Sequence, residues 1–438
     1  MRSWYLRARE SFWFVPALFA LGAVALALAL IEVDRLLLET GMAVPLATGG
    51  LSATGGRAIL TVIGGTMLGV AATSFSITIA VLATASSSYG PRLVRNFMAD
   101  RGNQVVLAVL TSTFLYTLVV LRAVRTEQDS SDAFVPALAV GFAVVLAVCD
   151  VAVLVYFIHH IARSVQVTTL QARVFDELMA AIDLLYPSER ERTEDAVEIA
   201  GLRAAAVVTA ARAGYVQHVD LPALTAYARQ VDALIQVLAP PGRHVLAGDA
   251  LARVLHSSEH DVDPGADRLE RTVRAAITIE RYRTPQQDLR YAAQGLTETG
   301  IRGLGSGTND PYTAVSAIDA LGVALTELFR RPPAATVHSD ASGRARVLCA
   351  WPTPAQVLAD VMLALRTYAM GHPLAVHAAI RMLMRIEAVA VGENRTALRN
   401  EVAAFRQAYL AASPTTVDTT PIVASLDGLI TRVDAPRA

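Results

Sequence analysis

The chain has 438 residues, with 38 basic against 39 acidic side chains and a formal net charge of −1. A balance this close to neutral argues against a nucleic acid as the main partner. Hydrophobic residues make up 53% of the chain, which exceeds the roughly 45–50% of soluble globular domains, and the mean hydropathy is +0.42. The composition therefore predicts that a large part of the chain lies in a lipid bilayer.

Four apolar stretches with almost no internal charge occupy the first part of the chain. Each reaches or approaches the roughly 20 residues that a helix needs to cross a bilayer. They cover residues 12–31, 58–85, 104–121 and 134–158. The first is too long for the core of a signal peptide, and no small-residue cleavage site precedes Glu32, so we expect an uncleaved span. We therefore predict a transmembrane domain over residues 1–162.

The arginines in the short loops predict the orientation of these spans. On one side of the membrane lie Arg2, Arg7, Arg9, Arg92, Arg95, Arg101, Arg163 and Arg173, and on the other lie Arg35, Arg57, Arg122 and Arg125. Positive residues collect on the cytoplasmic side. We therefore expect a multi-pass protein of the bacterial cytoplasmic (inner) membrane with both termini in the cytoplasm.

The second span differs from the others in its small and hydroxyl-bearing residues. Gly65 and Gly69 form a GxxxG motif that Thr73 continues at the same spacing, and Ser76 belongs to a second row of small residues. Such residues let helix backbones approach closely, and their hydroxyls can hydrogen-bond across the contact. Two interpretations stay open: packing among the four spans of one chain, or an oligomer seam or hydroxyl-lined pore.

Asp150 is the only acidic residue well inside a span. A carboxylate at that depth is costly, and it usually faces the interior of the bundle or water. One interpretation is a proton or cation site, with His159 or His160 as a relay at the membrane edge. The other is a carboxyl group that ties two helices together by hydrogen bonding.

The pattern after the spans indicates a cytoplasmic portion of mixed structure. Linker helices are expected over residues 163–200, followed by a small β-barrel or sandwich over residues 201–256. A helical domain is expected over residues 257–438, with a hairpin near 336–350 and a first helix over 268–284. The predicted fold class is mainly α, with a four-helix transmembrane region followed by a cytoplasmic α+β domain.

Two short polar segments are candidates for ligand binding in the cytoplasmic domain. Arg283, Gln287 and Asp288 fall on one side of a helical turn if the helix is continuous there. A buried Arg–Asp pair that organises the domain is one interpretation, and a ligand site is the other. Asn309 and Asp310 stand at a helix start, whose free amide groups can hold an anion, although Asp310 already caps that end.

No motif predicts catalysis. The segment His256-Ser257-Ser258-Glu259-His260 matches the HxxEH pattern of inverted zinc proteases, in which two histidines bind zinc and the glutamate acts as base. Here the pattern stands at the end of a strand and continues into a loop, which is the wrong context for that site. We therefore expect no metal, no cofactor and no catalytic residue, and we do not expect an enzyme.

Several segments in combination resemble one bacterial family. They are Ser11-Phe12-Trp13-Phe14-Val15-Pro16, Gly65-Thr66-Met67-Leu68-Gly69-Val70-Ala71, Ser87-Ser88-Tyr89-Gly90-Pro91-Arg92-Leu93-Val94-Arg95-Asn96-Phe97-Met98, Phe157-Ile158-His159-His160-Ile161-Ala162, Gly214-Tyr215-Val216-Gln217, Arg283-Thr284-Pro285-Gln286-Gln287-Asp288 and Gly307-Thr308-Asn309-Asp310-Pro311. The family is the predicted-membrane-protein family known only as a domain of unknown function, number twenty-two fifty-four. The resemblance extends to about Arg331 and implies four spans in a bacterial cytoplasmic membrane. It implies no activity, substrate or catalytic residue.

The leading functional hypothesis is a homo-oligomeric membrane protein with a channel- or transporter-like role and a cytoplasmic domain that gates or senses. It depends on the polarity of the second span and on Asp150. The expected partners are the lipid bilayer, further copies of the chain, and a small ion or ligand of unknown identity. The alternatives are a membrane scaffold or sensor, whose cytoplasmic domain binds a protein or a small ligand, and a membrane-anchored enzyme.

Overall fold

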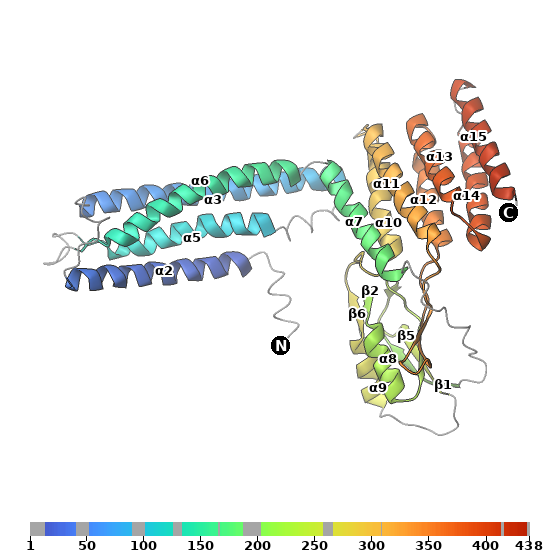
Figure 1. Ribbon diagram of the computed structural model, residues 1–438, viewed down its shortest axis with the longest axis horizontal. Helices are drawn as coiled ribbons and strands as arrows, with labels where there is room; N and C mark the ends of the chain where they lie inside the picture. Colours follow the sequence, from blue (N-terminus) through green and yellow to red (C-terminus); the bar gives the residue numbers. More distant parts are fainter. Residues whose placement is uncertain are drawn as a thin grey trace. The chain divides into compact units, whose positions relative to one another are not determined.

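The computed structural model describes most of the chain and divides it into two compact units. The described residues are 14–40, 52–89, 101–125, 134–164, 167–186, 203–256, 266–307, 309–412 and 416–435. The first unit comprises residues 1–170 and the second residues 171–438. Figure 1 shows an all-helical first unit and a second unit in which strands and helices are combined.

In the described part of the first unit, four helices are long and apolar enough to cross a membrane. They are α2 (Phe14–Glu39), α3 (Ala53–Tyr89), α5 (Arg101–Ala123) and α6 (Ala137–Ser164). The α5 helix is the most buried of the four and packs against each of the other three. Large apolar side chains such as Leu21, Val148 and Val155 are exposed on the outer helices, which is the surface expected of helices that face lipid.

A carboxylate from α2 joins the ends of three helices in this unit. The two carboxylate oxygens of Asp34 accept hydrogen bonds from the backbone amides of Leu138 and Ala139, each at 3.0 Å. These amides belong to the first turn of α6, where N–H groups have no partner within the helix. The Tyr116 hydroxyl on α5 donates to the carbonyl oxygen of Ala139 at 2.9 Å. The contact therefore fixes α2, α5 and α6 at one end of the bundle.

The strands of the second unit form two open sheets. They are β1 (Arg203–Thr209), β2 (Gly214–Val219), β3 (Leu234–Val237), β4 (His244–Val245), β5 (Ala250–His256), β6 (Ile277–Glu280), β7 (Val337–Ser339) and β8 (Ala345–Cys349). The larger sheet has the order β1-β5-β3-β8-β7 and the smaller one β4-β2-β6. All neighbouring strands are antiparallel except β3 and β8, which are parallel.

One hydrophobic core serves both sheets. It combines residues such as Val216 of β2, Ile235 of β3 and Val347 of β8 with the buried sides of two helices, α8 (Leu221–Gln230) and α9 (Ala266–Ala275). Because the two sheets bury their apolar faces together with these helices, neither sheet needs to close on itself.

Three details of the predicted architecture are wrong. Of the two alternatives predicted for the β-rich part, the barrel is wrong, since both sheets have free edges. The helix expected over residues 268–284 ends at Ala275, because Ile277 and Ile279 alternate inward and pair with β2. The strands are also not confined to residues 201–256: the hairpin expected near 336–350 is present as β7 and β8, but it joins the larger sheet, and β6 joins the smaller one.

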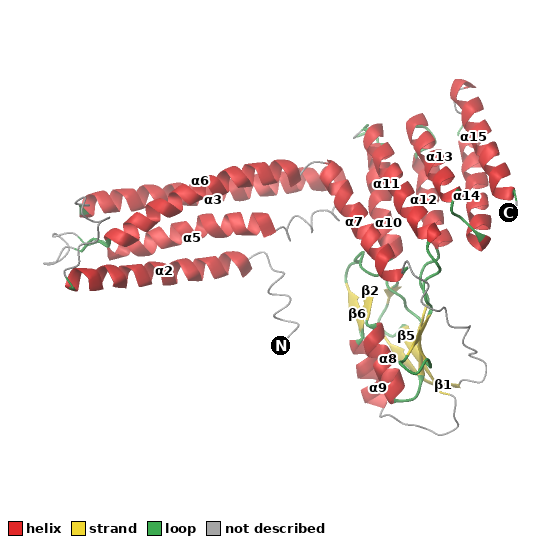
Figure 2. Cartoon of the chain, viewed as in Figure 1, coloured by secondary structure: helices red, strands yellow, loops and turns green. Residues whose placement is uncertain are grey.

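The remaining helices of the second unit form a stack of helical hairpins. They are α10 (Leu289–Gly303), α11 (Pro311–Arg330), α12 (Pro354–Tyr368), α13 (Pro373–Glu387), α14 (Gly392–Ala411) and α15 (Thr416–Asp434). A further helix, α7 (Val167–Leu185), begins in the first unit and continues into the second. One layer consists of α10, α12 and α14, and the other of α11, α13 and α15. Figure 2 shows these helices grouped at one end of the unit, with the strands at the other end.

The α11 helix is the fifth helix of the described chain that is long and apolar enough to cross a membrane. It lies between α10 and α13 in the hairpin stack, and Arg331 at its end binds Asp183 at 2.6 Å and the carbonyl oxygen of Tyr186 at 2.7 Å. Its apolar residues are therefore used for packing inside the second unit.

Candidate functional site

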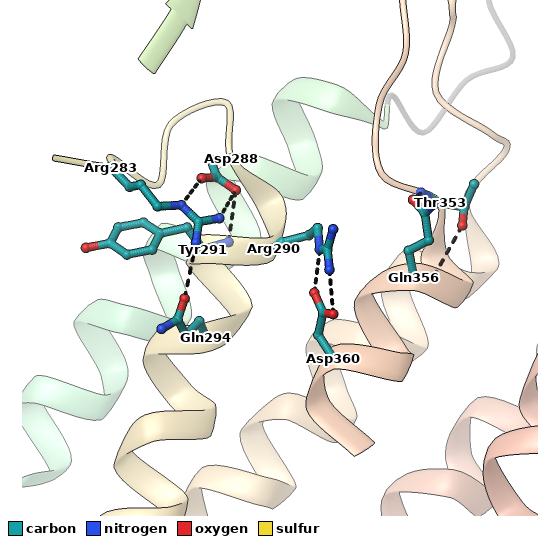
Figure 3. Close-up of polar contacts among 8 residues, drawn as sticks. All are labelled: Arg283, Asp288, Arg290, Tyr291, Gln294, Thr353, Gln356 and Asp360. Atoms are coloured by element: carbon teal, nitrogen blue, oxygen red, sulfur yellow. Dashed lines mark hydrogen bonds and ion pairs between the residues drawn. The ribbon is translucent and has the colours of Figure 1, made fainter. Parts of the chain in front are cut away.

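The second unit contains a cleft of about 810 Å³ between the hairpin stack and the loops of the sheet region. Its walls come from five segments: the turn Pro240–Arg243, the loop between β6 and α10, one face of α10, the segment Ala350–Pro352, and one face of α12. Figure 3 shows its principal polar side chains, which project from α10, α12 and the loop that precedes α10.

The Arg283–Asp288 pair forms the inner end of the polar lining. The guanidinium of Arg283 donates to both carboxylate oxygens of Asp288, at 2.7 and 2.9 Å, and the Asp288 side chain is only 3% exposed. Asp288 also caps α10 by accepting from the Tyr291 amide at 3.0 Å, and Arg283 lies over the Tyr291 ring at 4.8 Å. The structure thus brings Arg283 and Asp288 together as a buried, two-point ion pair (Figure 3).

Gly242 lets the β3–β4 turn approach this ion pair. Its φ angle is +91°, and a Cβ atom at this position would lie 2.4 Å from an Asp288 carboxylate oxygen. Its amide donates to the carbonyl oxygen of Val216 at 2.8 Å. Only glycine combines this backbone conformation with so close a contact.

A second two-point ion pair connects the two helices of the cleft. Arg290 on α10 donates from Nε and Nη2 to the carboxylate of Asp360 on α12, with the Nη2 contact at 2.6 Å (Figure 3). These hydrogen bonds raise the pKa of Arg290. At the start of α12, Thr353 and Gln356 form a reciprocal capping box. The Arg290–Asp360 pair therefore joins α10 to α12 at the cleft.

Polar contacts continue along α10. Arg283 Nη1 lies 3.4 Å from Gln294 Oε1, and Gln294 Nε2 donates to Glu298 Oε1 at 2.6 Å. The floor between the helices is apolar and includes Ala293, Ile301 and Val361. The arrangement is typical of a binding site, with a few held polar groups over an apolar base.

Two of the charged groups in the cleft have no oppositely charged partner among the described residues. Arg243 donates to the carbonyl oxygen of Leu238 at 2.9 Å, and no carboxylate lies within ion-pair distance of it in the described chain. Glu298 accepts from Gln294, and the described chain places no cation against it. Arg243, Arg290, Glu298, Trp351 and Asp360 were not identified from the sequence.

The other predicted ligand residues of this unit lie away from the cleft. Gln287 is buried, accepts from the backbone N–H of Val219 at 2.8 Å, and donates to the carbonyl oxygen of the same residue at 3.3 Å. Asp310 caps α11 through the Thr313 amide at 3.1 Å, and the hydrogen bonds from Thr313 lower the pKa of Asp310. Asn309 adopts a φ of +45° in the turn before it. Gln287 therefore fixes the backbone at Val219, and Asp310 fixes the first turn of α11.

The small residues of α3 point in two directions. Among the described residues, no atom lies within 4 Å of a Cβ built on Gly65 or Gly69, and Thr73 and Ser76 are exposed. A Cβ built on Gly64 would instead lie 2.7 Å from the Thr117 hydroxyl of α5. The close helix contact within the chain therefore uses Gly64, and the GxxxG row faces outward.

Asp150 lies near the middle of α6 and is 1% exposed. The Asp150 carboxyl faces the buried Thr113 hydroxyl of α5, and among the described residues neither group makes a closer hydrogen bond. His159 is exposed and His160 stacks on Tyr156 at 5.5 Å. Because nine residues of helix correspond to about 14 Å, neither histidine directly contacts Asp150.

The HxxEH segment lies outside the described residues except for His256. Among the residues that the structure describes, no three His, Cys, Asp or Glu side chains are grouped closely enough to hold a metal ion. This observation concerns that part of the chain alone.

Comparison with known proteins assigns the chain to a family. The family model described as predicted membrane protein (DUF2254) matches residues 9–385. An uncharacterised protein of Mycobacterium tuberculosis is 30% identical over 350 residues, which cover 79% of this chain and 67% of the relative. An uncharacterised protein of Mycobacterium bovis is 31% identical over 353 residues with the same coverage, and no solved structure matches. The chain belongs to the predicted membrane protein family DUF2254.

Proposed function

We propose that this protein is a membrane sensor whose second unit binds a small ligand in the cleft between α10 and α12. The observation that carries the proposal is the cleft itself, with its volume of about 810 Å³, because ligand sites of roughly 300–1,000 Å³ with apolar floors and few polar groups are typical of small-molecule binding. Both ion pairs that border it are two-point contacts. Their side chains are thus pre-organised, which lowers the entropic cost of binding.

The proposed location is the bacterial inner membrane, with both termini and the second unit in the cytoplasm. The distribution of arginines between the loops supports this orientation. Homo-oligomer formation is part of the proposal, because the Gly65–Gly69 row on α3 is exposed and uncontacted within 4 Å in one chain. A sensor of this kind would report a cytoplasmic ligand to a membrane assembly.

The experiment is a thermal-shift screen of the full chain in detergent against a library of cytoplasmic metabolites. Ala350 lines the cleft and is exposed, so Ala350→Trp should fill the cleft without disturbing the core. Ala247 is exposed in the β4–β5 turn away from the cleft, and Ala247→Trp is the matched control. We expect ligands that raise the Tm of the wild type and of the control and have no effect on Ala350→Trp. Equal shifts in all three proteins, or no shift with any compound, would refute the proposal.

A second candidate function is ion or solute transport, and one observation favours it. Asp150 is buried in the middle of α6, where it faces the Thr113 hydroxyl of α5 and no charged group of the described chain, and intramembrane carboxylates often belong to ion pathways. Flux in proteoliposomes should then be present for the wild type and reduced for Asp150→Asn. Absence of flux for protons and common cations in the wild type would eliminate this candidate.

A further inference from the structure

In the first unit, Asp150 lies between two apolar clusters along α6. Ala143, which precedes it in the chain, belongs to one cluster, and Leu146 packs against that cluster. Phe157, which follows it, belongs to the other cluster, and Leu154 packs against that one. Asp150 itself is 1% exposed. A carboxylate enclosed in this way is costly unless a cation or a proton neutralises its charge.

The Thr113 hydroxyl of α5, which faces this carboxyl group, differs from its neighbours. Thr111 and Thr117 donate to backbone carbonyl oxygens of the preceding turn, at 2.6 and 2.8 Å. Such bonds are a usual role of threonine inside a helix. Thr113 donates to no backbone carbonyl of the described chain. Its hydroxyl can therefore serve Asp150 in both states, as donor to the carboxylate and as acceptor from the protonated carboxyl group.

None of the described helices that pack against α6 faces Asp150 with a charged group. On α3, the titratable residues are Arg57 and Tyr89, which stand near its two ends. On α5, Tyr116 lies between the terminal arginines, and its hydroxyl already donates to Ala139. On α2, the charged residues lie near its C-terminal end, where Asp34 binds the first turn of α6.

The other titratable residues of α6 do not neutralise Asp150 either. Cys149 is exposed. The next titratable residue along the helix, Tyr156, follows six residues after Asp150, which corresponds to about 9 Å of helix. The described helices therefore leave the charge of a carboxylate at this position unmatched.

The oxygen atoms at this position suit a proton better than a metal ion. Calcium takes about 6–8 oxygen ligands and magnesium an octahedral set, whereas Asp150 and Thr113 offer the two carboxylate oxygens and the one hydroxyl oxygen. A proton needs a single carboxylate oxygen. Its transfer from a hydronium ion leaves water and a neutral carboxyl group, which costs far less in apolar surroundings than a charge.

We propose that the first unit transports protons, with Asp150 as the binding site and Thr113 as a positioning residue that holds the carboxyl group in both protonation states. The carboxylate takes up a proton from water on one side of the membrane and releases it to water on the other. This inference rests on the second candidate function, transport by the first unit, and names its ion.

The main test is proton movement into proteoliposomes of the full chain, followed with a pH-sensitive dye inside the vesicles. Potassium and valinomycin hold the membrane potential constant while a pH gradient drives protons inward. We expect the flux of the wild type to exceed that of protein-free vesicles. Asp150→Asn, which keeps the size of the side chain but cannot exchange the proton, should fall to the protein-free level.

Three variants of α5 test the role of Thr113. Thr113→Val should lower the flux about tenfold, which is the loss typical of one hydrogen bond to a charged group, and Thr113→Ser should restore it. Thr117→Val is the matched control on the same helix, because the Thr117 hydroxyl already donates to the backbone. Its flux should equal that of the wild type.

Infrared difference spectra of the same samples, between alkaline and acidic buffer, detect the bound proton directly. We expect the wild type and Thr117→Val to show a carbonyl band of a protonated carboxyl group that Asp150→Asn lacks. The amide bands in these spectra show whether each variant keeps its helices, so that a loss of flux through unfolding is recognised.

The outcomes separate this inference from the function on which it rests. Proton flux that is unchanged in Asp150→Asn, or the absence of an Asp150 carboxyl band, would overturn the inference. Flux of sodium or potassium that depends on Asp150, without proton flux, would also overturn it but would leave transport as the function. If the wild type moves neither protons nor these metal ions, the inference and the transport function are both wrong.

Discussion

At the scale of single residues, the cleft depends on a glycine that has no functional group of its own. Gly242 and Gly248 both adopt φ angles near +90°, but only Gly242 has an atom within 4 Å of its missing Cβ. That atom belongs to Asp288, which at once neutralises Arg283 and caps α10. The Arg283–Asp288 pair can therefore keep its geometry only because residue 242 has no side chain.

Replacement of Gly242 by alanine should disorganise the cleft more than the same change at Gly248. Both substitutions place alanine at positive φ, which costs roughly 1–2 kcal/mol. Gly242→Ala must in addition displace the buried Asp288 carboxylate from Arg283. Because the Arg283 side chain is 26% exposed, the added loss should be smaller than the about 3–5 kcal/mol of a fully buried pair. Denaturant unfolding of the two variants measures the difference, and equal loss of stability would show that the Asp288 contact contributes nothing.

Two carboxylates that bind Arg346 of the β7–β8 hairpin should make the stability of the second unit depend on pH. Hydrogen bonds from Ser342 and then from Arg346 hold the pKa of Asp340 well below its ordinary value. A hydrogen bond from Arg346 lowers the pKa of Asp232 in the same way. A carboxylate with a depressed pKa in the folded state stabilises the fold above the ordinary value of about 4, and this stabilisation is lost as the pH falls further.

Asp340→Asn should therefore lower the Tm near neutral pH, and the deficit should shrink as the pH falls below about 4. Scanning calorimetry between pH 7 and pH 3 measures this difference in Tm between the variant and the wild type. Asp267→Asn, at an exposed position in the first turn of α9, is the control and should show a smaller deficit at neutral pH. A deficit for Asp340→Asn that is constant across the pH range would contradict the assignment.

At the scale of elements, one glycine of α3 packs against a neighbouring helix of the same chain, whereas two others lie on an exposed face of α3. Gly64 packs against Thr117 of α5, and its neighbour Gly65 contacts nothing within 4 Å. The GxxxG pattern predicts a helix contact but cannot tell which partner provides it. The structure leaves this row available for a second copy of the chain.

Adjacent substitutions on α3 should accordingly have different effects. Gly64→Leu should destabilise the bundle by about 1–3 kcal/mol because it overpacks the α3–α5 contact. Gly69→Leu should leave the unfolding of the bundle unchanged and reduce oligomer formation, as measured by cross-linking in lipid nanodiscs. Unchanged oligomers in Gly69→Leu would remove the support for an α3 seam.

At the scale of the whole molecule, the number of membrane spans determines on which side of the membrane each part of the second unit lies. The α11 helix could cross a membrane by length and composition, yet it packs between α10 and α13. With four spans, the residues before and after α11 lie on the same side of the membrane. With five, they would lie on opposite sides.

A membrane-impermeant maleimide should label Arg271→Cys and Glu393→Cys from the same side in oriented vesicles. Both positions are exposed and flank α11. Both reporters are made in Cys149→Ala protein, because Cys149 is exposed. The remaining native thiol, Cys349, gives little background because burial raises its pKa to about 12. Labelling of the two reporters from opposite sides would show that α11 crosses the membrane.

The sequence by itself determined the features that depend on local pattern. Long apolar stretches predicted α2, α3, α5 and α6, and an aspartate before a proline predicted the start of α11. These signals are contained in a few neighbouring residues, because helix periods and caps repeat within one or two turns.

Only the tertiary structure decided which surfaces meet. Arg290 and Asp360 are separated by 70 residues in the sequence. Strand β8 pairs with β3 although α9, α10 and α11 lie between the two strands in the sequence. Likewise, nothing local distinguishes Gly64 from Gly65, or Gly242 from Gly248. The burial of apolar faces selects these pairings over the whole chain, and so the cleft could not be found from the sequence of any one segment.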